Sequence, residues 1–228
     1  MTSSTFTIVV LNAGVSDPSS TRLLADRAAQ RVVTYGSERG HSVAIRAIDM
    51  RELLPELPAA LSSQLLGPKI TAAAEALRTA DAIVAAAPVY KAGASGLFTS
   101  VLQVLDNDLL IGTPVILAAT AGTARHALVV DQEMRALFAY LRTLPVPTSI
   151  FAATEDWNDT ALSERIDRAA FELITLMESG FKDAVRADAW KKYQHSYGSA
   201  GGTELDIDVS SDMMRLATGG SAPPPRLP

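Results

Sequence analysis

Cysteine is absent from the 228-residue chain. The protein therefore cannot form a disulfide, a thiol nucleophile, a Cys-ligated zinc site or an iron–sulfur cluster. Histidine is also scarce: only His41, His126 and His195 occur, far apart and without an H-E-x-x-H run. The sequence therefore predicts no metal site. The lack of cysteine suits a reducing compartment, and we expect a cytoplasmic protein.

The chain also has fewer basic than acidic residues, and it has no long apolar run. The chain has 20 Lys and Arg residues against 25 Asp and Glu residues, a formal net charge of -5, so a large basic surface for nucleic acid is not expected. The N-terminal apolar run Phe6–Leu11 is interrupted by Thr7 and is too short for a signal peptide or a membrane span. We expect neither nucleic acid nor a membrane as a partner.

The composition does supply an ordinary core, because 48% of the residues are hydrophobic and 20% are charged. A length of 228 residues predicts one domain with an extension. From residue 196 onward the chain becomes rich in Gly, Ser and Pro. We therefore expect one domain over residues 1–195 and a C-terminal arm or disordered tail over residues 196–228.

Five short apolar segments alternate with stretches of helical spacing. Such alternation predicts an α/β fold with an open, doubly wound parallel sheet, and apolar residues on both sides of each segment fit strands covered on both faces. In this fold ligands bind beyond the carboxyl ends of the strands. The expected strands are FTIVVL from Phe6, SVAIRAI from Ser42, AIVAAA from Ala82, TPVILAAT from Thr113 and PTSIFAAT from Pro147.

The helical stretches between these strands are recognised by apolar residues that recur every three or four positions. A weaker helix is expected over residues 70–77. The predicted buried stripes are Leu23, Leu24, Ala28 and Val32; Leu97, Val101, Leu102, Val104 and Leu105; Leu128, Met134, Leu137, Phe138 and Leu141; and Ile166, Ala170, Leu173, Ile174 and Met177.

The loop after the first strand, NAGVSDPSSTRLLADR, is rich in hydroxyl groups at the start of a helix. Hydroxyl groups and the free N–H groups of a helix N-terminus together favour an anion. The loop lacks the lysine of G-x-x-x-x-G-K-[ST], and Gly14 alone does not make G-x-G-x-x-G, which argues against a P-loop and a standard dinucleotide fingerprint. An ordinary helix cap is the alternative, but four hydroxyl residues within six positions favour a phosphate site: Ser16, Ser19, Ser20 and Thr21.

The loop after the third strand, APVYKAGASGLFTSVLQVLD, has small residues over 92–96. Small side chains allow a flat ring to approach the backbone, although a tight strand-to-helix turn would need the same residues. The segment lacks the last glycine of G-x-S-x-G, so a serine-hydrolase elbow is not expected. Tyr90 is either a stacking residue or a half-buried strand end.

The loop after the fourth strand, TAGTARHAL, brings Thr120, Gly122 and Thr123 to the same edge. His126 is interpreted as a surface residue of a first helical turn rather than a proton donor. Two acidic positions are interpreted as turn or capping residues, namely Asp49 at the end of the second strand and Asp159 before the last helix.

At these three loops the chain resembles the NADPH-dependent FMN reductase family, over roughly residues 6–180. The resemblance is carried by SDPSSTRLLADRA, by PVYKAGASGLFTSVLQVLD and by TAGTARHAL. The middle motif is the most specific, since family members look like P-x-Y-x-x-x-x-x-G-x-(L/F)-(K/T)-x-x-(L/I)-D there. Where many members have lysine in that motif this chain has Thr99. The subgroup it resembles most accompanies luciferase-like flavin monooxygenases.

The resemblance implies a flavodoxin-like fold with five strands in the order 2-1-3-4-5, and it assigns a flavin site residue by residue. Its phosphate contacts would be Ser16, Ser20, Thr21 and Arg22. Its isoalloxazine contacts would be Pro88, Val89, Tyr90, Lys91, Ala92, Gly93, Ser95, Thr120 and Gly122.

The implied activity is hydride transfer from NADPH or NADH to FMN, with the protein supplying binding and orientation and no catalytic side chain. Reduced flavin would then leave for a monooxygenase partner. The alternatives are an FMN-containing quinone, azo or nitro reductase, and a flavodoxin-like electron carrier without NAD(P)H turnover. The resemblance also implies a homodimer or homotetramer. Nucleotide preference, the tightness of FMN binding and the physiological acceptor stay open.

Overall fold

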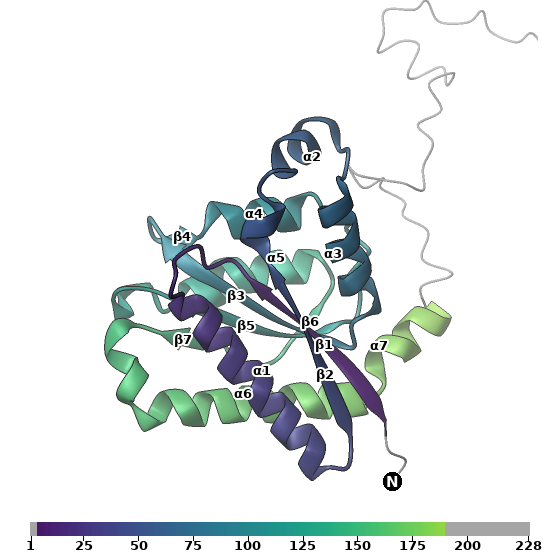
Figure 1. Cartoon of the computed structure of the whole chain (residues 1–228). Coiled ribbons are helices and arrows are strands. Elements are labelled where there is room, and N and C mark those ends of the chain that lie inside the picture. The colour runs from purple at the N-terminus through teal and green to yellow at the C-terminus, as the bar shows by residue number, and fades with distance from the viewer. Residues whose placement is uncertain (1–3, 190–228) are drawn as a thin grey trace, which may run out of the picture. The chain divides into compact units, whose positions relative to one another are not determined.

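The computed structural model describes residues 4–189, so the predicted C-terminal arm lies outside the described residues. A central parallel sheet runs through this part of the chain in the order β2-β1-β3-β5, and both β6 and β7 pair with β5 (Figure 1). Numbered by the five predicted segments, the order is 2-1-3-4-5, which confirms the expected sheet. The strands are β1 Thr5–Asn12, β2 Ser42–Asp49, β3 Ala82–Tyr90, β4 Gly93–Ala94, β5 Pro114–Thr120, β6 Leu144–Pro145 and β7 Ile150–Ala152.

Helices cover both faces of the sheet (Figure 1). The long helices α1 (Ser20–Glu38) and α6 (Thr160–Glu178) pack on one face through Leu24, Leu173 and their neighbours. The other face carries α2 Leu57–Ser63, α3 Pro68–Thr79, α4 Gly96–Gln103 and α5 Arg135–Tyr140. Shorter turns are η1 Met50–Leu53, η2 Ala124–His126, η3 Val130–Met134, η4 Thr154–Asn158, α7 Phe181–Ala184 and η5 Val185–Ala189.

Three details of the predicted burial pattern are wrong. Leu23 and Leu128 were expected on buried stripes, but they are 53% and 62% exposed. Leu128 precedes a π-helical turn, η3, whose wider spacing turns Val129 and Val130 inward instead. The second strand is not covered on both faces, because β2 is the edge of the sheet and its residues 44–47 are exposed.

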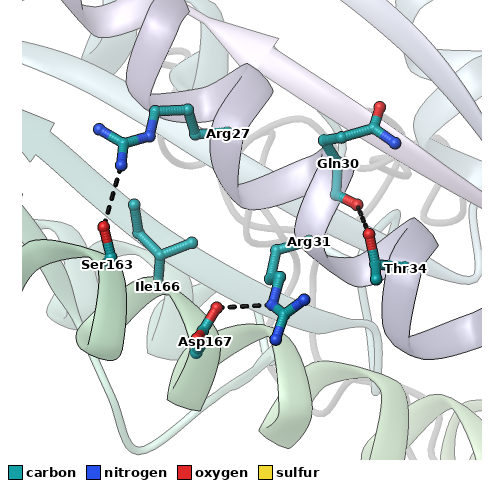
Figure 2. Close-up of a pocket in the computed structure, with 7 residues that line it drawn as sticks. All are labelled: Arg27, Gln30, Arg31, Thr34, Ser163, Ile166 and Asp167. Atoms are coloured by element: carbon teal, nitrogen blue, oxygen red, sulfur yellow. Dashed lines mark hydrogen bonds and ion pairs between the residues drawn. The ribbon is translucent and has the colours of Figure 1, made fainter. Parts of the chain in front are cut away.

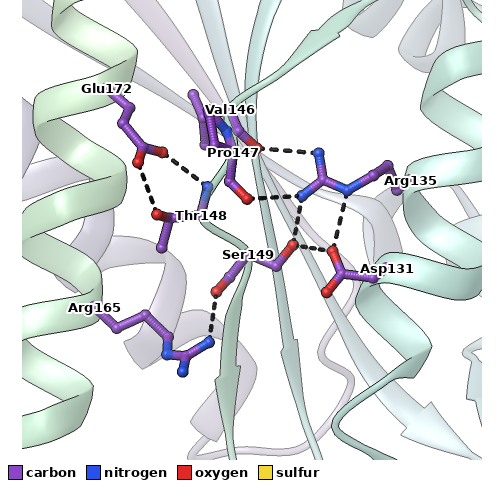
Figure 3. A network of polar contacts seen from close by, with 8 residues as sticks. All are labelled: Asp131, Arg135, Val146, Pro147, Thr148, Ser149, Arg165 and Glu172. Atoms are coloured by element: carbon purple, nitrogen blue, oxygen red, sulfur yellow. Dashed lines mark hydrogen bonds and ion pairs between the residues drawn. The ribbon is translucent and has the colours of Figure 1, made fainter.

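The predicted fifth strand is divided, and only Ile150–Ala152 pairs as β7. The segment before it, residues 146–149, is held by side chains from both layers of helices (Figure 3). Arg135 donates to the carbonyl oxygens of Val146 and Pro147 at 3.1 and 3.3 Å, while Glu172 accepts from the Thr148 amide and hydroxyl, both at 2.8 Å. The Val146 amide still donates to the Val115 carbonyl of β5 at 2.9 Å, and the side-chain bonds replace the ladder bonds that residues 147–149 would have made.

The turns α7 and η5 lie against the C-terminal end of α3 through one cation each, since Lys182 and Arg186 both donate to the Arg78 carbonyl. The ammonium group of Lys182 donates to the carbonyl oxygens of Arg78 and Ala80, and the guanidinium group of Arg186 donates to those of Leu109 and Ile111. Cations at the C-terminus of a helix complement its dipole. Burial, followed by repulsion from Arg186, lowers the pKa of Lys182 to about 8 from its ordinary 10.5.

This depressed pKa predicts a pH dependence of stability. Between about pH 8 and pH 10.5 the unfolded chain keeps a proton on Lys182 that the folded chain has released, so the free energy of unfolding rises with pH in that window. We expect Lys182→Met to remove this contribution. Urea unfolding of the wild type and the variant at several pH values gives the free energy of unfolding of each as a function of pH. The difference between the two curves is the contribution of Lys182. Parallel curves from pH 8 to pH 10 would show that the side chain does not titrate as described.

Within the described part of the chain, no helix is both long enough and apolar enough to cross a membrane.

Candidate functional site

The three loops that the sequence singles out follow β1, β3 and β5, whose carboxyl ends share one edge of the sheet. In the sheet register Asn12 lies beside Ala86, and Pro88 lies beside Thr120. The hydroxyl groups of Thr21 and Thr120 are 2.7 Å apart and join the first loop directly to the third. Residues separated by about a hundred positions are thus brought together at the point where the strand order reverses, the usual ligand position in open α/β sheets.

The first loop is folded around its own polar groups. The Asn12 side chain accepts from the Gly14 amide at 3.0 Å, and the Ser19 hydroxyl caps α1 by accepting from the Arg22 amide at 3.2 Å. The amides of Ser20 and Thr21 donate to no acceptor among residues 4–189. Free N–H groups at the positive end of a helix favour an anion, so these two amides of the 19-residue α1 could hold a phosphate group.

The predicted phosphate residues do not all have equivalent surroundings. Ser16 and Ser20 are exposed, whereas Thr21 is 2% exposed and already bonded to Thr120. The Arg22 side chain pairs through Nε with Asp26, at 2.8 and 2.9 Å from its two oxygens. Asn12, whose buried side chain shapes the loop, was not predicted from the sequence; its position as the last residue of β1 was the available signal.

The buried pair of threonine hydroxyls gives a stability prediction. We expect Thr21→Val and Thr120→Val each to cost about 1–2 kcal/mol, because each change leaves the other hydroxyl buried without a partner. The double variant should cost clearly less than the sum. Urea unfolding of all four proteins measures the coupling. Thr34→Val is the control, because the Thr34 hydroxyl bonds within α1, to the Gln30 carbonyl at 3.1 Å. Additive losses would show that the two hydroxyl groups do not interact.

The second loop forms a hairpin that the sequence analysis did not expect. Strand β4 pairs back on the end of β3, and Lys91 and Ala92 form the turn with φ values of 52° and 66°. Non-glycine residues with positive φ at both positions store strain, and such strain gathers at ligand sites. The Ala94 amide donates to Glu133 Oε2 at 3.0 Å, which ties the hairpin to η3.

Glu133 is the second functional candidate that sequence reasoning missed. It lies 39 residues from the hairpin, and no local pattern marks it. A Cβ atom added to Gly93 would lie 3.0 Å from the same carboxylate oxygen, so a side chain at this position would press on the Glu133 carboxylate.

The segment after the hairpin is anchored by Ser95, which is 2% exposed. Its amide donates to the carbonyl of Pro88 at 3.0 Å, and its hydroxyl caps α4 by accepting from the Phe98 amide at 3.4 Å. Ser95 therefore fixes the backbone around the hairpin. Tyr90 is the last residue of β3 and is 51% exposed, so it is a half-buried strand end whose ring is still accessible to a ligand.

The third loop is open at its centre. A Cβ atom added to Gly122 would have no neighbour within 4 Å, while the adjacent Thr120 is 5% exposed. His126 ends the η2 turn and is partly exposed. Asp49 and Asp159 cap η1 and α6 through the amides of Arg51 and Ala161, as interpreted from the sequence.

This edge of the sheet has the features that FMN requires. A phosphate group needs free donors, which the amides at the start of α1 supply, and a flat ring needs backbone without side chains above it, which Gly122 supplies. Within the described ranges no group of three or more His, Cys, Asp or Glu residues could hold a metal ion. The residues present fit a flavin nucleotide.

A cleft of about 470 Å³ lies elsewhere, between α1 and α6 (Figure 2). Its charged groups are already engaged, since Arg31 pairs with Asp167 at 2.6 Å and Arg27 donates to the Ser163 hydroxyl at 3.1 Å. The cleft runs along two helices that pack on one face of the sheet, and its polar groups hold those helices together.

Comparison with known proteins agrees with this geometry. The profile of the NADPH-dependent FMN reductase family matches residues 6–158. An NADH-dependent FMN reductase, SfnF, of Pseudomonas fluorescens is 33% identical over 73% of this chain and 86% of its own length. An FMN reductase (NADPH) of Pseudomonas aeruginosa is 32% identical over 68% of this chain and 81% of its own.

Solved structures give the same result. An oxidoreductase from Corynebacterium diphtheriae is 42% identical with a TM-score of 0.74, and the match covers 77% of this chain and 98% of that one. The apo form of the NADH:FMN oxidoreductase EmoB is 25% identical with a TM-score of 0.66, over 75% of this chain and 89% of that one. This chain thus belongs to the NADPH-dependent FMN reductase family, and it is an NAD(P)H:flavin oxidoreductase.

Proposed function

We propose that FMN binds at the carboxyl edge of the sheet and that the protein releases reduced flavin to a separate acceptor, such as a monooxygenase. The observation that carries the site is the meeting of the three loops, the first and third of which are joined by the 2.7 Å contact between the hydroxyl groups of Thr21 and Thr120. When bound, FMN supplies the chemistry by accepting a hydride from the nicotinamide nucleotide.

The residues at this edge have two roles in the proposal. The amides and hydroxyl groups of Ser16, Ser20 and Thr21, with the Arg22 guanidinium, bind the phosphate group. The ring lies against the backbone of the hairpin and of the third loop. Its contacts are Pro88, Val89, Tyr90, Lys91, Ala92, Gly93, Ser95, Thr120 and Gly122.

Orientation is the main contribution of the protein in this proposal. Ser95 and Glu133 hold the two sides of the hairpin in place through the Pro88 carbonyl and the Ala94 amide. A fixed ring position lowers the barrier to hydride transfer, because the reacting partners no longer have to find one another in solution. No side chain needs to donate or accept a proton in this step.

The proposed release of reduced flavin is tested by the colour and the kinetics of the purified protein. We expect a protein that loses its FMN on gel filtration and then oxidises NADPH or NADH only when FMN is added, with FMN saturating as a substrate. A protein that stays yellow and passes electrons to a quinone, azo or nitro compound without added FMN would contradict release. Bound FMN with no oxidation of either nucleotide would indicate an electron carrier.

We also propose that the protein works as a homodimer or homotetramer, as the family resemblance implies. Light scattering coupled to gel filtration tests this, and a monomer at assay concentration would contradict it.

A further inference from the structure

A second cleft, of about 360 Å³, opens at the carboxyl end of the edge strand β2, next to the phosphate loop. Its walls come from α1, β2, η1 and α3. Three cations line it, Arg22, Arg46 and Lys69, although the chain as a whole has a net charge of -5. Cations gathered in one concave place on an acidic protein indicate an anionic ligand.

Two of these cations have no ion-pair partner among the described residues. Arg46 and Lys69 form no ion pair with any carboxylate among residues 4–189. The nearby Glu75 carboxylate is bonded to Arg78 through both of its oxygens, at 2.8 and 2.6 Å. It acts on Arg46 only electrostatically, beyond ion-pair distance. The third cation, Arg22, uses Nε for Asp26, and its terminal nitrogens donate to no described residue.

The two acidic residues of the cleft, Asp49 and Glu52, differ in whether they have an ion-pair partner. Asp49 is engaged by Arg51, through the amide at 3.0 Å and the guanidinium at 3.6 Å. Glu52 also lines the cleft and has no ion-pair partner in the described ranges. A carboxylate accepts hydrogen bonds from ribose hydroxyl groups, so unpaired cations beside one free carboxylate suit a phosphorylated ribose better than phosphate alone.

The cleft lies within reach of the flavin edge. Asp49 is beside Asn12 in the sheet register, and Arg51 lies 3.5 Å from the carbonyl oxygen of Val15 in the phosphate loop. The end of β2 is two strand spacings, about 10 Å, from the end of β3, where the ring is proposed to bind. A dinucleotide extended from a nicotinamide over the ring can cover that span.

We propose that this cleft binds the 2′-phosphorylated ribose of NADPH, through Arg46, Lys69 and Arg22 to the phosphate and Glu52 to the ribose. The cleft thereby selects NADPH over NADH. This inference rests on the proposed flavin site, because the nicotinamide end must reach the same ring.

The test uses the full chain, its Arg46→Gln/Lys69→Gln double variant and Arg168→Gln, an exposed arginine of α6, as the control. Arg22 is left unchanged because it is also a proposed FMN contact. With saturating FMN, we expect KM for NADPH to rise roughly tenfold in the double variant, with kcat and KM for NADH unchanged. The control should match the wild type. An equal rise for both nucleotides, or no rise for NADPH, would overturn the inference.

The affinities of 2′,5′-ADP, 5′-AMP and inorganic phosphate, measured by calorimetry, test the cleft without requiring FMN reduction. They therefore distinguish a failure of this inference from a failure of the proposed function. We expect 2′,5′-ADP to bind the wild type at least tenfold more tightly than either of the others, and to lose that advantage in the double variant. Equal binding of inorganic phosphate would make the cleft a general phosphate site and overturn the inference. If 2′,5′-ADP binds as expected but neither nucleotide reduces FMN, the proposed function fails and the cleft assignment stands.

Discussion

Gly14→Ala is expected to weaken FMN binding by roughly a hundredfold, since the loss of a hydrogen bond to a charged group such as phosphate costs about 1.5–3 kcal/mol. The added Cβ atom would lie 2.1 Å from the Ser19 hydroxyl, 3.0 Å from Thr21 Cβ and 3.1 Å from the Asn12 side-chain oxygen. All three neighbours shape the phosphate loop, so relief of the clash moves the start of α1. Fluorescence quenching of FMN measures the loss.

The matched control for this change is Gly96→Ala. A Cβ atom there would meet nothing within 4 Å, and alanine is favourable in the first turn of α4. We expect Gly96→Ala to bind FMN as the wild type does. Overpacking at Gly14 should also cost about 1–3 kcal/mol of stability, so binding is measured where both variants are fully folded by circular dichroism. Unchanged FMN affinity in folded Gly14→Ala would refute the phosphate site.

Arg135→Met is expected to lower the free energy of unfolding by about 2–3 kcal/mol, since a charged donor is lost from several acceptors at once. Its guanidinium group pairs with Asp131 at 3.1 Å and donates to the Ser149 hydroxyl at 2.7 Å, besides the two carbonyls of residues 146 and 147 (Figure 3). Ser149 is 9% exposed and also bonds to Asp131, so its hydroxyl keeps one partner in the variant.

The control is Arg165→Met, because Arg165 makes a single long contact, 3.4 Å, with the Ser149 carbonyl. We expect this variant to lose less than about 0.5 kcal/mol. Urea unfolding at neutral pH measures both. Arg135 follows η3 directly, and η3 carries the Glu133 contact to the hairpin, so Arg135→Met should also weaken FMN binding. Equal losses in the two arginine variants would show that the bonded network does not stabilise this segment.

The alternation of strands and helices and the place of the ligand edge could be predicted from the sequence pattern, whereas the strand order 2-1-3-4-5 came from the family resemblance. Apolar runs such as Ile8–Leu11 and Ile83–Ala87 are fully buried in the structure, and a short apolar run bounded by turn residues is the sequence signal of a buried strand. The helix over residues 166–177 is also as predicted, since its apolar stripe is entirely buried. The cap residues Asp49 and Asp159 follow from local preferences.

Other features could not be predicted, because they depend on contacts between distant residues. Leu23 breaks the expected stripe because α6 covers only one side of α1, and β2 is exposed because nothing pairs with its outer edge in the described part of the chain. The short β4 was hidden because its turn places Lys91 and Ala92 at positive φ, where glycine or asparagine would have been the signal.

The sequence by itself determined the composition of the site: loops rich in hydroxyl groups and small residues after three buried strands, in a chain without cysteine. Hydrophobic periodicity and helix capping act over a few residues, so a sequence records them directly. The tertiary structure alone decided which of these groups meet. It joined Thr21 to Thr120, placed Glu133 against the hairpin and gathered Arg46 and Lys69 beside the phosphate loop. Those contacts arise from sheet register and helix packing, which no local pattern encodes.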